Sequence, residues 1–481
     1  MFKKREEVQE YIKSENVEII DFKIVDMVGK WHHLSITKEK YDEEIYKKGI
    51  GFDGSSYGFK SVEKSDMVFI PDISTAFIDP FAKVKTLVMI CNIYTIEKSG
   101  LKRYQDDPRY IVEKTKKLLK EKGIADECEL GPEFEFYVLD HISVKNENGN
   151  MYVNIDSKQS PWNLEKTQED NLGIVTPKEG AYHLDKPFDT SSDFRDKVSL
   201  LLEKANIPIK YHHSENGSPG QVEVEVDFAD IGDMADRTMI IKYFLRNQAY
   251  KSGKTITFMP KPFSFEAGNG FHIHFKMKKE GRHIFYKEGG YSDLSDTALY
   301  AIGGILKHAP AIMPFSNQST NSYKRLVPGY EAPVSICYAT ANRSAVIRIP
   351  GYAVDKDEKR FEVRSPDAMC NPYLTYAAFL LAMIDGIENK IDPKEEGFGP
   401  YDVNLYDLDE EKQKKIKSLP TNLVEASQEL IRDKDFLIKD KVFSDNLINN
   451  QIKRIKEEHN YISKLPHPEE FKLYYNNDSV K

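Results

Sequence analysis

Acidic and imidazole side chains alternate with apolar ones in four short segments of the chain. The segments are GPEFEFYVL (131–139), QVEVEVDF (221–228), GFHIHFKM (270–277) and KRFEVRS (359–365). Because alternate residues of a β-strand point to the same face, each segment would gather its polar side chains on one side. These faces carry Glu133 and Glu135, then Gln221, Glu223 and Glu225, then His272 and His274, and finally Arg360, Glu362 and Arg364.

Together, the four polar faces predict a site for divalent cations. A Glu-x-Glu pattern beside aromatic residues forms strands poorly unless the carboxylates have partners, and clustered carboxylates repel one another. Oxygen ligands with one or two imidazoles and no thiolate favour Mg²⁺ or Mn²⁺ over zinc. For any one strand, a polar face turned to solvent explains the pattern equally well, and we keep that explanation for Glu225.

Arginines are frequent downstream of the first three segments. They are Arg325, Arg343, Arg348, Arg360 and Arg364. Guanidinium groups bind carboxylates and phosphates through paired hydrogen bonds, and divalent cations with arginines are the usual equipment of phosphoryl transfer. ATP is therefore the expected co-substrate.

Two apparent nucleotide-binding motifs fail on inspection. Residues 253–255, Gly-Lys-Thr, resemble the end of a P-loop, but Gln248 stands where its first glycine is required. Gly268 and Gly270 lack the third glycine of a dinucleotide-binding fingerprint and precede a strand-like segment.

A small β-rich unit and several long helices must position these side chains. We expect helices at 3–15, 109–122, 233–251, 295–309 and 373–389, and early strands at 17–27 and 84–93. The turn Asp106-Asp107-Pro108 opens the second helix, so we place a domain boundary before Asp106. The polar run 141–180 is typical of an excursion or a hairpin. The charged tail after Gly399 is typical of helices.

Composition excludes several classes of protein. The 481 residues carry a net charge of -9, which argues against a nucleic-acid partner and against a polybasic membrane binder. The longest strongly apolar stretch, 377–384, is far shorter than the ~20 residues of a membrane-spanning helix, and we expect a cytoplasmic location. The four cysteines are far apart, which favours reduced, inert thiols.

Seven blocks of the sequence resemble the type I glutamine synthetase family, in that family's order. They are FDGSS (52–56), SDMVFIPD (65–72), GPEFEF (131–136), TFMPKP (257–262), NSYKRLVPGYEAP (321–333), NRSAVIRIP (342–350) and NPY (371–373). The resemblance implies an α+β fold: a β-grasp-like domain at 1–105 and a catalytic domain at 106–481, with an antiparallel, curved, metal-lined sheet flanked by helices. It also implies a dodecamer of two hexameric rings with active sites shared between subunits.

The resemblance assigns roles to individual residues. It implies one metal site at Glu135, Glu215 and Glu223 and a second at Glu133, His272 and Glu362. It implies ATP contacts at Phe228, His274, Arg343, Arg348 and Arg360, with Phe228 packing on adenine. It implies substrate contacts at Gly268, Asn269, His272, Arg325, Glu331 and Arg364, with Arg325 on the α-carboxylate of glutamate. Asp53, Glu331 and Arg343 would be catalytic: Asp53 as the ammonium site, contributed across the subunit boundary, and Glu331 in the closing loop.

The activity implied is ATP-dependent ligation of ammonia to glutamate through γ-glutamyl phosphate, with two or more Mg²⁺ or Mn²⁺ ions. Two departures bear on substrate details: Ala267 replaces a family asparagine, and Lys276 a small polar residue. We expect Asn269 either to supply the missing amide or to be a turn residue in left-handed conformation. The alternatives are a ligase for another amine and a catalytically dead homologue. Tyr406 resembles a tyrosine adenylylated in some bacterial members, but an ordinary exposed tyrosine fits equally well.

Overall fold

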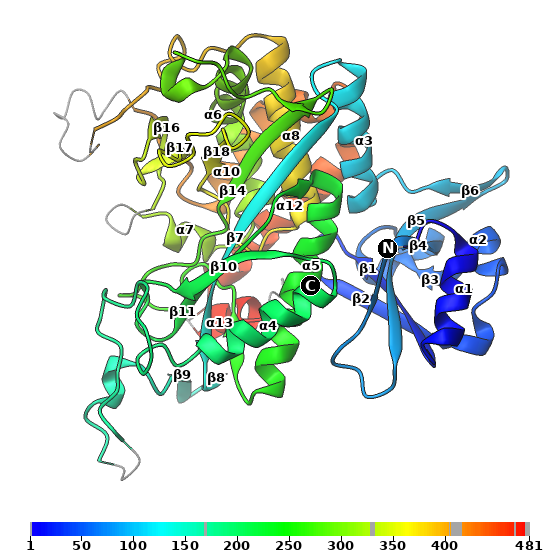
Figure 1. Cartoon of the computed structure of the whole chain (residues 1–481), viewed down its shortest axis with the longest axis horizontal. Helices are drawn as coiled ribbons and strands as arrows, with labels where there is room; N and C mark the ends of the chain where they lie inside the picture. The colour runs from blue at the N-terminus through cyan, green and yellow to red at the C-terminus, as the bar shows by residue number, and fades with distance from the viewer. Residues whose placement is uncertain are drawn as a thin grey trace.

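The computed structural model describes residues 2–167, 171–327, 332–403, 405, 416–465 and 468–476. Within them the chain forms two sheets of different size, joined by the segment that leads into helix α3 (Figure 1). The first sheet lies in the N-terminal part, on the right of Figure 1, and the second lies in the larger remainder.

The N-terminal sheet has strand order β2-β1-β5-β4-β3, with β6 paired to β5. Its strands are β1 (Ile19–Val25), β2 (Trp31–Thr37), β3 (Ile50–Asp53), β4 (Asp66–Ile78), β5 (Thr86–Glu97) and β6 (Gly100–Arg103). Helices α1 (Arg5–Ser14) and α2 (Glu44–Lys48) accompany it. Strands β1 and β5 pair in parallel and the other pairs are antiparallel. One face is apolar and packs a separate small core that includes Phe22 and Phe69.

The second sheet has the order β10-β11-β7-β14-β18-β17-β16, with three short strands added to β7 and β14. Its strands are β7 (Glu127–Leu139), β10 (Ile209–Ser214), β11 (Gln221–Val226), β12 (Ala229–Asp230), β13 (Thr255–Thr257), β14 (Ile273–Lys279), β15 (Arg282–His283), β16 (Ser335–Thr340), β17 (Ala345–Ile349) and β18 (Phe361–Val363). Its pairs are antiparallel, as expected, except for the parallel pair β16–β17.

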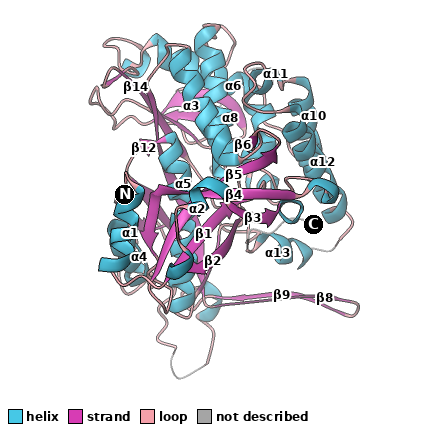
Figure 2. Cartoon of the chain, turned by 90° about the vertical axis from the view of Figure 1, so that its right-hand side faces the viewer, coloured by secondary structure: helices cyan, strands magenta, loops and turns pink. Residues whose placement is uncertain are grey.

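Helices pack on the second sheet and on one another. They are α3 (Pro108–Glu121), α4 (Ser192–Lys204), α5 (Ile231–Lys251), α6 (Asp296–Ser316), α7 (Ser322–Arg325), α8 (Pro372–Glu388), α10 (Leu423–Arg432), α11 (Asp435–Ile438), α12 (Asp445–Ile462) and α13 (Pro468–Tyr474). Helix α8 is buried from Pro372 to Gly386 and packs against α3, α5 and α6. A helix that is apolar all round is expected in such an enclosed position. Figure 2 shows α6 and α8 running side by side.

Most expected elements are present, with shifts at their ends. Asp107 caps α3 and Asn371 caps α8, each ahead of a proline at the first helical position. The helix expected to end at 309 runs on to Ser316 through two prolines, because its buried side packs against α8 and α10. The polar run after 140 contains the hairpin β8 (His141–Glu147) and β9 (Asn150–Asp156), which extends away from the body in Figure 2.

The four cysteines are buried and unpaired. Among the described residues, no helix combines the length and apolar character needed to span a membrane. The boundary between 105 and 106 stays a prediction; it falls between β6 and α3.

Candidate active site

A cavity of about 1010 Å³ opens over the middle of the second sheet. Twelve of the residues singled out in the sequence line it: Glu133, Glu135, Glu215, Gln221, Glu223, Ala267, Gly268, His272, Arg325, Arg343, Arg348 and Arg364. They come from positions more than 200 residues apart in the chain. Strands β10, β11, β7, β14 and β18 lie next to one another in the sheet, so residues from distant segments meet on one surface.

Carboxylates face one another directly across two of these strands. Glu223 of β11 is paired with Glu135 of β7, and Glu225 with Glu133. All four side chains are buried. Like charges opposite one another destabilise a sheet, so this register needs compensating positive charge.

The solvent-facing explanation retained for Glu225 is wrong. Its side chain is fully buried. Lys210 of the neighbouring strand β10 donates to Glu225 Oε1 at 2.6 Å, which supplies the compensating charge for this carboxylate. Alternation within one strand could not reveal this pairing, because Lys210 lies on the neighbouring strand, where the register of β10 and β11 shifts.

One group of potential ligands gathers around His272. Its Nδ1 lies 2.8 Å from Glu133 Oε2, 3.5 Å from Glu362 Oε1 and 3.6 Å from Glu135 Oε1. His274 Nε2 also approaches Glu133, at 2.8 Å, and Glu133, His274 and Glu362 offer ligand atoms within 4.8 Å of one another. The structure thus brings together the three residues expected at the second metal site, with His274 as a fourth neighbour.

A second group lies where β10 meets β11. His213, Glu215 and Glu223 offer ligand atoms within 4.8 Å of one another. His213 Nε2 is 3.5 Å from Glu223 Oε1, and its Nδ1 is 3.7 Å from Glu215 Oε2. The structure brings Glu215 and Glu223 together as expected, but sequence reasoning missed His213, a histidine with no alternating pattern around it.

The electrostatics of this surface favour a bound cation. Burial, followed by the charges of Glu133 and Glu135, raises the pKa of Glu223 well above its usual value. For Glu133, burial alone would raise the pKa, but hydrogen bonds from His272 and His274 hold it well below its usual value. A carboxylate among carboxylates is disfavoured until an opposite charge arrives. Five carboxylates with imidazoles and no thiolate fit Mg²⁺ or Mn²⁺.

Two arginines hold Glu362 from either side. Arg348 donates to its Oε2 at 2.6 Å and Arg364 to its Oε1 at 2.7 Å. Glu362 is fully buried and does not itself line the cavity, whereas both arginines do. The Glu362 carboxylate fixes the guanidinium groups of Arg348 and Arg364 at the cavity wall. Guanidinium groups held in this way can bind phosphate or carboxylate oxygens.

Arg325 is positioned by main-chain carbonyl groups. It donates to the oxygens of Ser365, Pro366 and Arg364 at 2.9 to 3.0 Å, and its Nη2 lies 3.4 Å from His272 Nε2. Glycine is required beside it, since a Cβ at Gly268 would lie 2.8 Å from Arg325 Cγ. These carbonyl groups hold Arg325 in place without neutralising its positive charge, which lies at the edge of a cavity suited to an anionic substrate.

Both expectations for Asn269 are contradicted. Its side chain is fully buried: its amide donates to the Met259 carbonyl at 2.9 Å, and its Oδ1 accepts from Gln221 at 3.0 Å. It does not line the cavity and does not adopt positive φ. Asn269 therefore holds the loop against neighbouring segments and does not supply the amide missing at Ala267.

The residues expected around the nucleotide base lie together outside this cavity. Phe228 packs edge-on to His274 at 6.3 Å between ring centroids and against Gly131, where a Cβ would come within 2.9 Å of its ring. Lys276 Nζ lies 4.6 Å from the Phe228 ring centroid and Arg360 Cζ lies 5.8 Å from it. The departure at Lys276 thus puts a cation on the aromatic ring expected to hold adenine.

Asp53 lies in the N-terminal unit and does not line the cavity of its own chain. Hydrogen bonds from the hydroxyl and main chain of Ser55 lower the pKa of this exposed carboxylate to about 2, so it is charged at neutral pH. Glu331 and Tyr406 lie outside the described residues.

Aromatic and imidazole rings missed in the sequence form one wall of the cavity. Tyr182 stacks on His183 at 4.0 Å between ring centroids and meets His213 edge-on at 5.3 Å. Arg195, almost fully buried, pairs with Asp189 beside them. Strand alternation could not reveal these residues, since most of them lie outside the strands.

Two family sequence models match the chain. "Glutamine synthetase, beta-Grasp domain" covers residues 16–96, and "Glutamine synthetase, catalytic domain" covers residues 105–474. The protein named glutamine synthetase from Aquifex aeolicus is 42% identical over 471 residues, 98% of each chain. A protein named 3-hydroxylaminophenol mutase, from Cupriavidus pinatubonensis, is 40% identical over the same share of both chains. Among solved structures, a Plasmodium falciparum glutamine synthetase superposes with a TM-score of 0.86 at 28% identity, covering 98% of this chain and 99% of that one.

Proposed function

Because the chain belongs to the glutamine synthetase family, we propose that this enzyme joins ammonia to the side chain of L-glutamate at the expense of ATP. The products are L-glutamine, ADP and phosphate. The observation that carries the proposal is the cavity in which buried carboxylates and imidazoles face three fixed arginines, Arg325, Arg348 and Arg364. That combination suits an anionic substrate and a phosphate under transfer.

In the first step the γ-carboxylate of glutamate attacks the γ-phosphorus of ATP, and ADP leaves. Arg325 binds the α-carboxylate of glutamate and orients the chain of the substrate. Arg343 and Arg364 stabilise the charge that spreads over the phosphoryl oxygens. Arg348 and Arg360 hold the nucleotide phosphates, and Phe228 packs on the base. The product of this step is γ-glutamyl phosphate.

In the second step ammonium loses a proton and the resulting ammonia attacks the activated carbonyl carbon. Phosphate leaves with one oxygen of the former carboxylate. Asp53 of a neighbouring subunit binds the ammonium, and Glu331 shields the intermediate from water. The exposed position of Asp53, away from its own cavity, supports a site shared between subunits. A dodecamer of two hexameric rings is the assembly we propose.

Divalent cations are part of this proposal. Glu135, Glu215 and Glu223 would hold one ion and Glu133, His272 and Glu362 another, with His213 and His274 beside them. When bound, Mg²⁺ or Mn²⁺ would neutralise phosphoryl oxygens and lower the charge repulsion between ATP and glutamate.

Release of phosphate from ATP tests the proposal. With glutamate, ammonium and Mg²⁺ present, the protein should form glutamine and phosphate in equal amounts. Parallel reactions with methylamine in place of ammonium test the alternative of a ligase for another amine. Isomerisation of 3-hydroxylaminophenol, the reaction named for a relative at 40% identity, is a third arm. A protein active only in the second or third arm would refute our assignment.

A further inference from the structure

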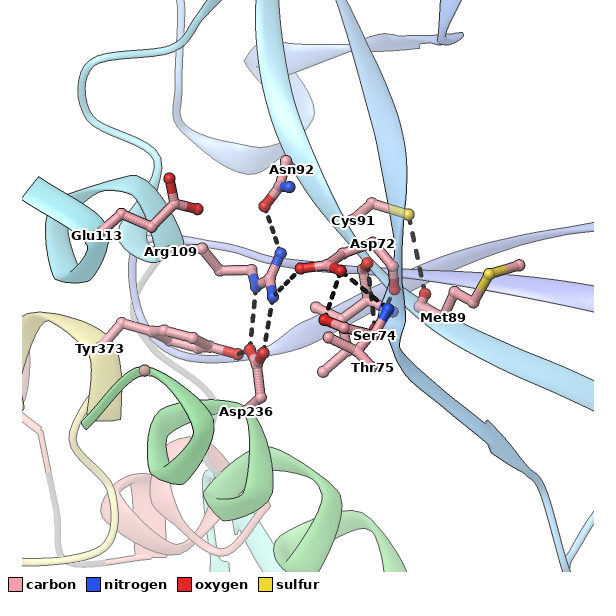
Figure 3. Close-up of polar contacts among 12 residues, drawn as sticks. Asp72, Ser74, Thr75, Met89, Cys91, Asn92, Arg109, Glu113, Asp236 and Tyr373 are labelled. Carbon is pink, nitrogen blue, oxygen red and sulfur yellow. Dashed lines mark hydrogen bonds and ion pairs between the residues drawn. The ribbon is translucent and has the colours of Figure 1, made fainter. Parts of the chain in front are cut away.

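Two sequence blocks that the proposed mechanism does not use meet at one buried arginine. Asp72 ends the block SDMVFIPD, and Tyr373 ends the block NPY. Both take part in a polar cluster around Arg109, the second residue of α3 (Figure 3). The side chain of Arg109 is only 8% exposed.

Arg109 connects the N-terminal sheet to helices α5 and α8 of the larger part of the molecule. From the catalytic side, Asp236 of α5 accepts two hydrogen bonds from its guanidinium group, at 2.7 and 3.0 Å, and Tyr373 of α8 donates to Asp236 at 2.7 Å. From the N-terminal sheet, Asp72 of β4 accepts at 3.0 Å, and Asn92 of β5 accepts from Nη1. Burial would lower the pKa of Arg109, but Asp236 and the other partners hold it well above its usual value, so the group stays charged.

Strand β4 is interrupted immediately beyond this contact. Its pairing with β5 shifts between Asp72 and Phe77. In the interruption, Thr75 Oγ1 takes the place of a main-chain partner and accepts from the Ile90 main-chain N–H at 2.8 Å, and Ser74 bonds to the Asp72 carboxylate. Extra residues in one strand disrupt the ladder and bend the strand. The interruption is therefore a point about which the two halves of β4 can change direction.

Arg109 holds the half of β4 that leads towards Asp53. That half, Asp66–Asp72, pairs with β3, and Asp53 lies opposite Asp66. Six residues of strand, roughly 20 Å, separate Asp66 from Asp72. A cavity of about 200 Å³ adjoins the cluster, so the strand has room to move on that side. Other links from this strand region to α5 follow the interruption: Tyr243 donates to Asp79, and the Phe77 ring packs on Phe244.

We propose that Arg109 is a positioning residue for the ammonium-binding step. By joining β4 and β5 to α5 on the Asp53 side of the interruption, it fixes where β3 presents Asp53 to the neighbouring subunit. The inference rests on the proposed function, in which Asp53 binds ammonium. It gives the two blocks ending at Asp72 and Tyr373 a common role.

The variant Asp72→Asn tests this role in the assembled enzyme. It weakens the contact to β4 but leaves Arg109 paired with Asp236, so no buried charge is left without a partner. We expect KM for ammonium to rise by about threefold to tenfold, with KM for ATP changed less than about twofold. Amide hydrogen exchange in β3 should accelerate, while exchange in β14 should be unchanged.

A matched variant separates positioning from ordinary loss of stability. Asp385→Asn removes a partly buried carboxylate bound to His308 and Lys439, in the helical layer and away from β4. It should lower Tm but leave KM for ammonium and exchange in β3 unchanged. Equal KM changes in the two variants, or unaltered exchange in β3 of Asp72→Asn, would overturn the inference. If the wild type forms no glutamine, the proposed function fails instead, and the exchange measurement still decides whether the Arg109 cluster fixes β3.

Discussion

Replacing Glu223 by glutamine should have opposite effects on stability with and without a divalent cation. Glu223 lies opposite Glu135, and burial with neighbouring carboxylates raises its pKa well above the usual value. Removing one of two facing like charges relieves roughly 0.2–1 kcal/mol. For 481 residues the unfolding entropy of ~2.1 cal/mol/K per residue means that about 1 kcal/mol shifts Tm by about 1 °C. The metal-free variant should therefore melt up to about 1 °C above the metal-free wild type.

With Mg²⁺ the order should reverse. A ligand at a hundred times its Kd stabilises a protein by about 2.7 kcal/mol, here about 3 °C. Glu223→Gln should lose most of that gain, and its glutamine-forming activity should fall at least about a hundredfold, because even residues that only support metal ligands contribute ~10–100-fold. Differential scanning calorimetry with and without Mg²⁺ measures both effects.

Glu129→Gln is the matched control. Glu129 lies on the same strand, β7, and binds Lys278 at 2.7 Å outside the cavity. This variant should melt slightly lower than the wild type in both conditions and keep the full Mg²⁺-induced shift. If Glu223→Gln instead behaves like Glu129→Gln, Glu223 is not part of a cation site and the reasoning is refuted.

Three further predictions follow from other parts of the structure. Mixed oligomers of Asp53→Ala and Glu362→Ala chains should form glutamine, although neither variant does so alone. If verified mixed oligomers recover no activity, each active site is built within one chain. Gly268→Ala should raise KM for glutamate about tenfold and leave KM for ATP unchanged, because its Cβ would lie 2.7 Å from the Pro260 carbonyl oxygen and 2.8 Å from Arg325 Cγ, and Arg325 would have to shift. An unchanged KM for glutamate would contradict this. Burial would lower the pKa of His308, but hydrogen bonds to two aspartates raise it overall. The charged imidazole therefore contributes its full stabilisation below the pKa of the unfolded chain, ~6.5, and loses it as the pH rises through the pKa of the folded protein. The Tm difference between wild type and His308→Gln should therefore be largest near pH 6 and shrink towards pH 9. A difference that grows with pH would show that His308 is not charged in the folded protein.

Strand alternation predicted much of the candidate site, because a period of two directly gives the face on which each residue lies. It placed Glu133, Glu223 and His272 on one surface before their strands were known to be neighbours. It could not give the cross-strand partners, which depend on register between distant segments. Alternation alone therefore turns Glu225 to solvent, whereas its partner Lys210 lies on β10.

Loops and helix ends were less predictable. The amide of Asn269 was expected in the cavity, but the Met259 carbonyl and Gln221 bind it. Helix α6 was expected to end before Pro310, yet tertiary packing against α8 and α10 carries it to Ser316. In both cases contacts between distant segments outweighed the local signal.

The most direct test of the central claim follows one oxygen atom. If the γ-carboxylate of glutamate attacks ATP and ammonia then displaces phosphate, an oxygen of that carboxylate must end in the phosphate. The reaction would be run with glutamate labelled with ¹⁸O in the γ-carboxylate, and the released phosphate analysed by mass spectrometry. The account predicts one ¹⁸O atom in each phosphate formed with glutamine. Glutamine formed together with unlabelled phosphate would contradict it.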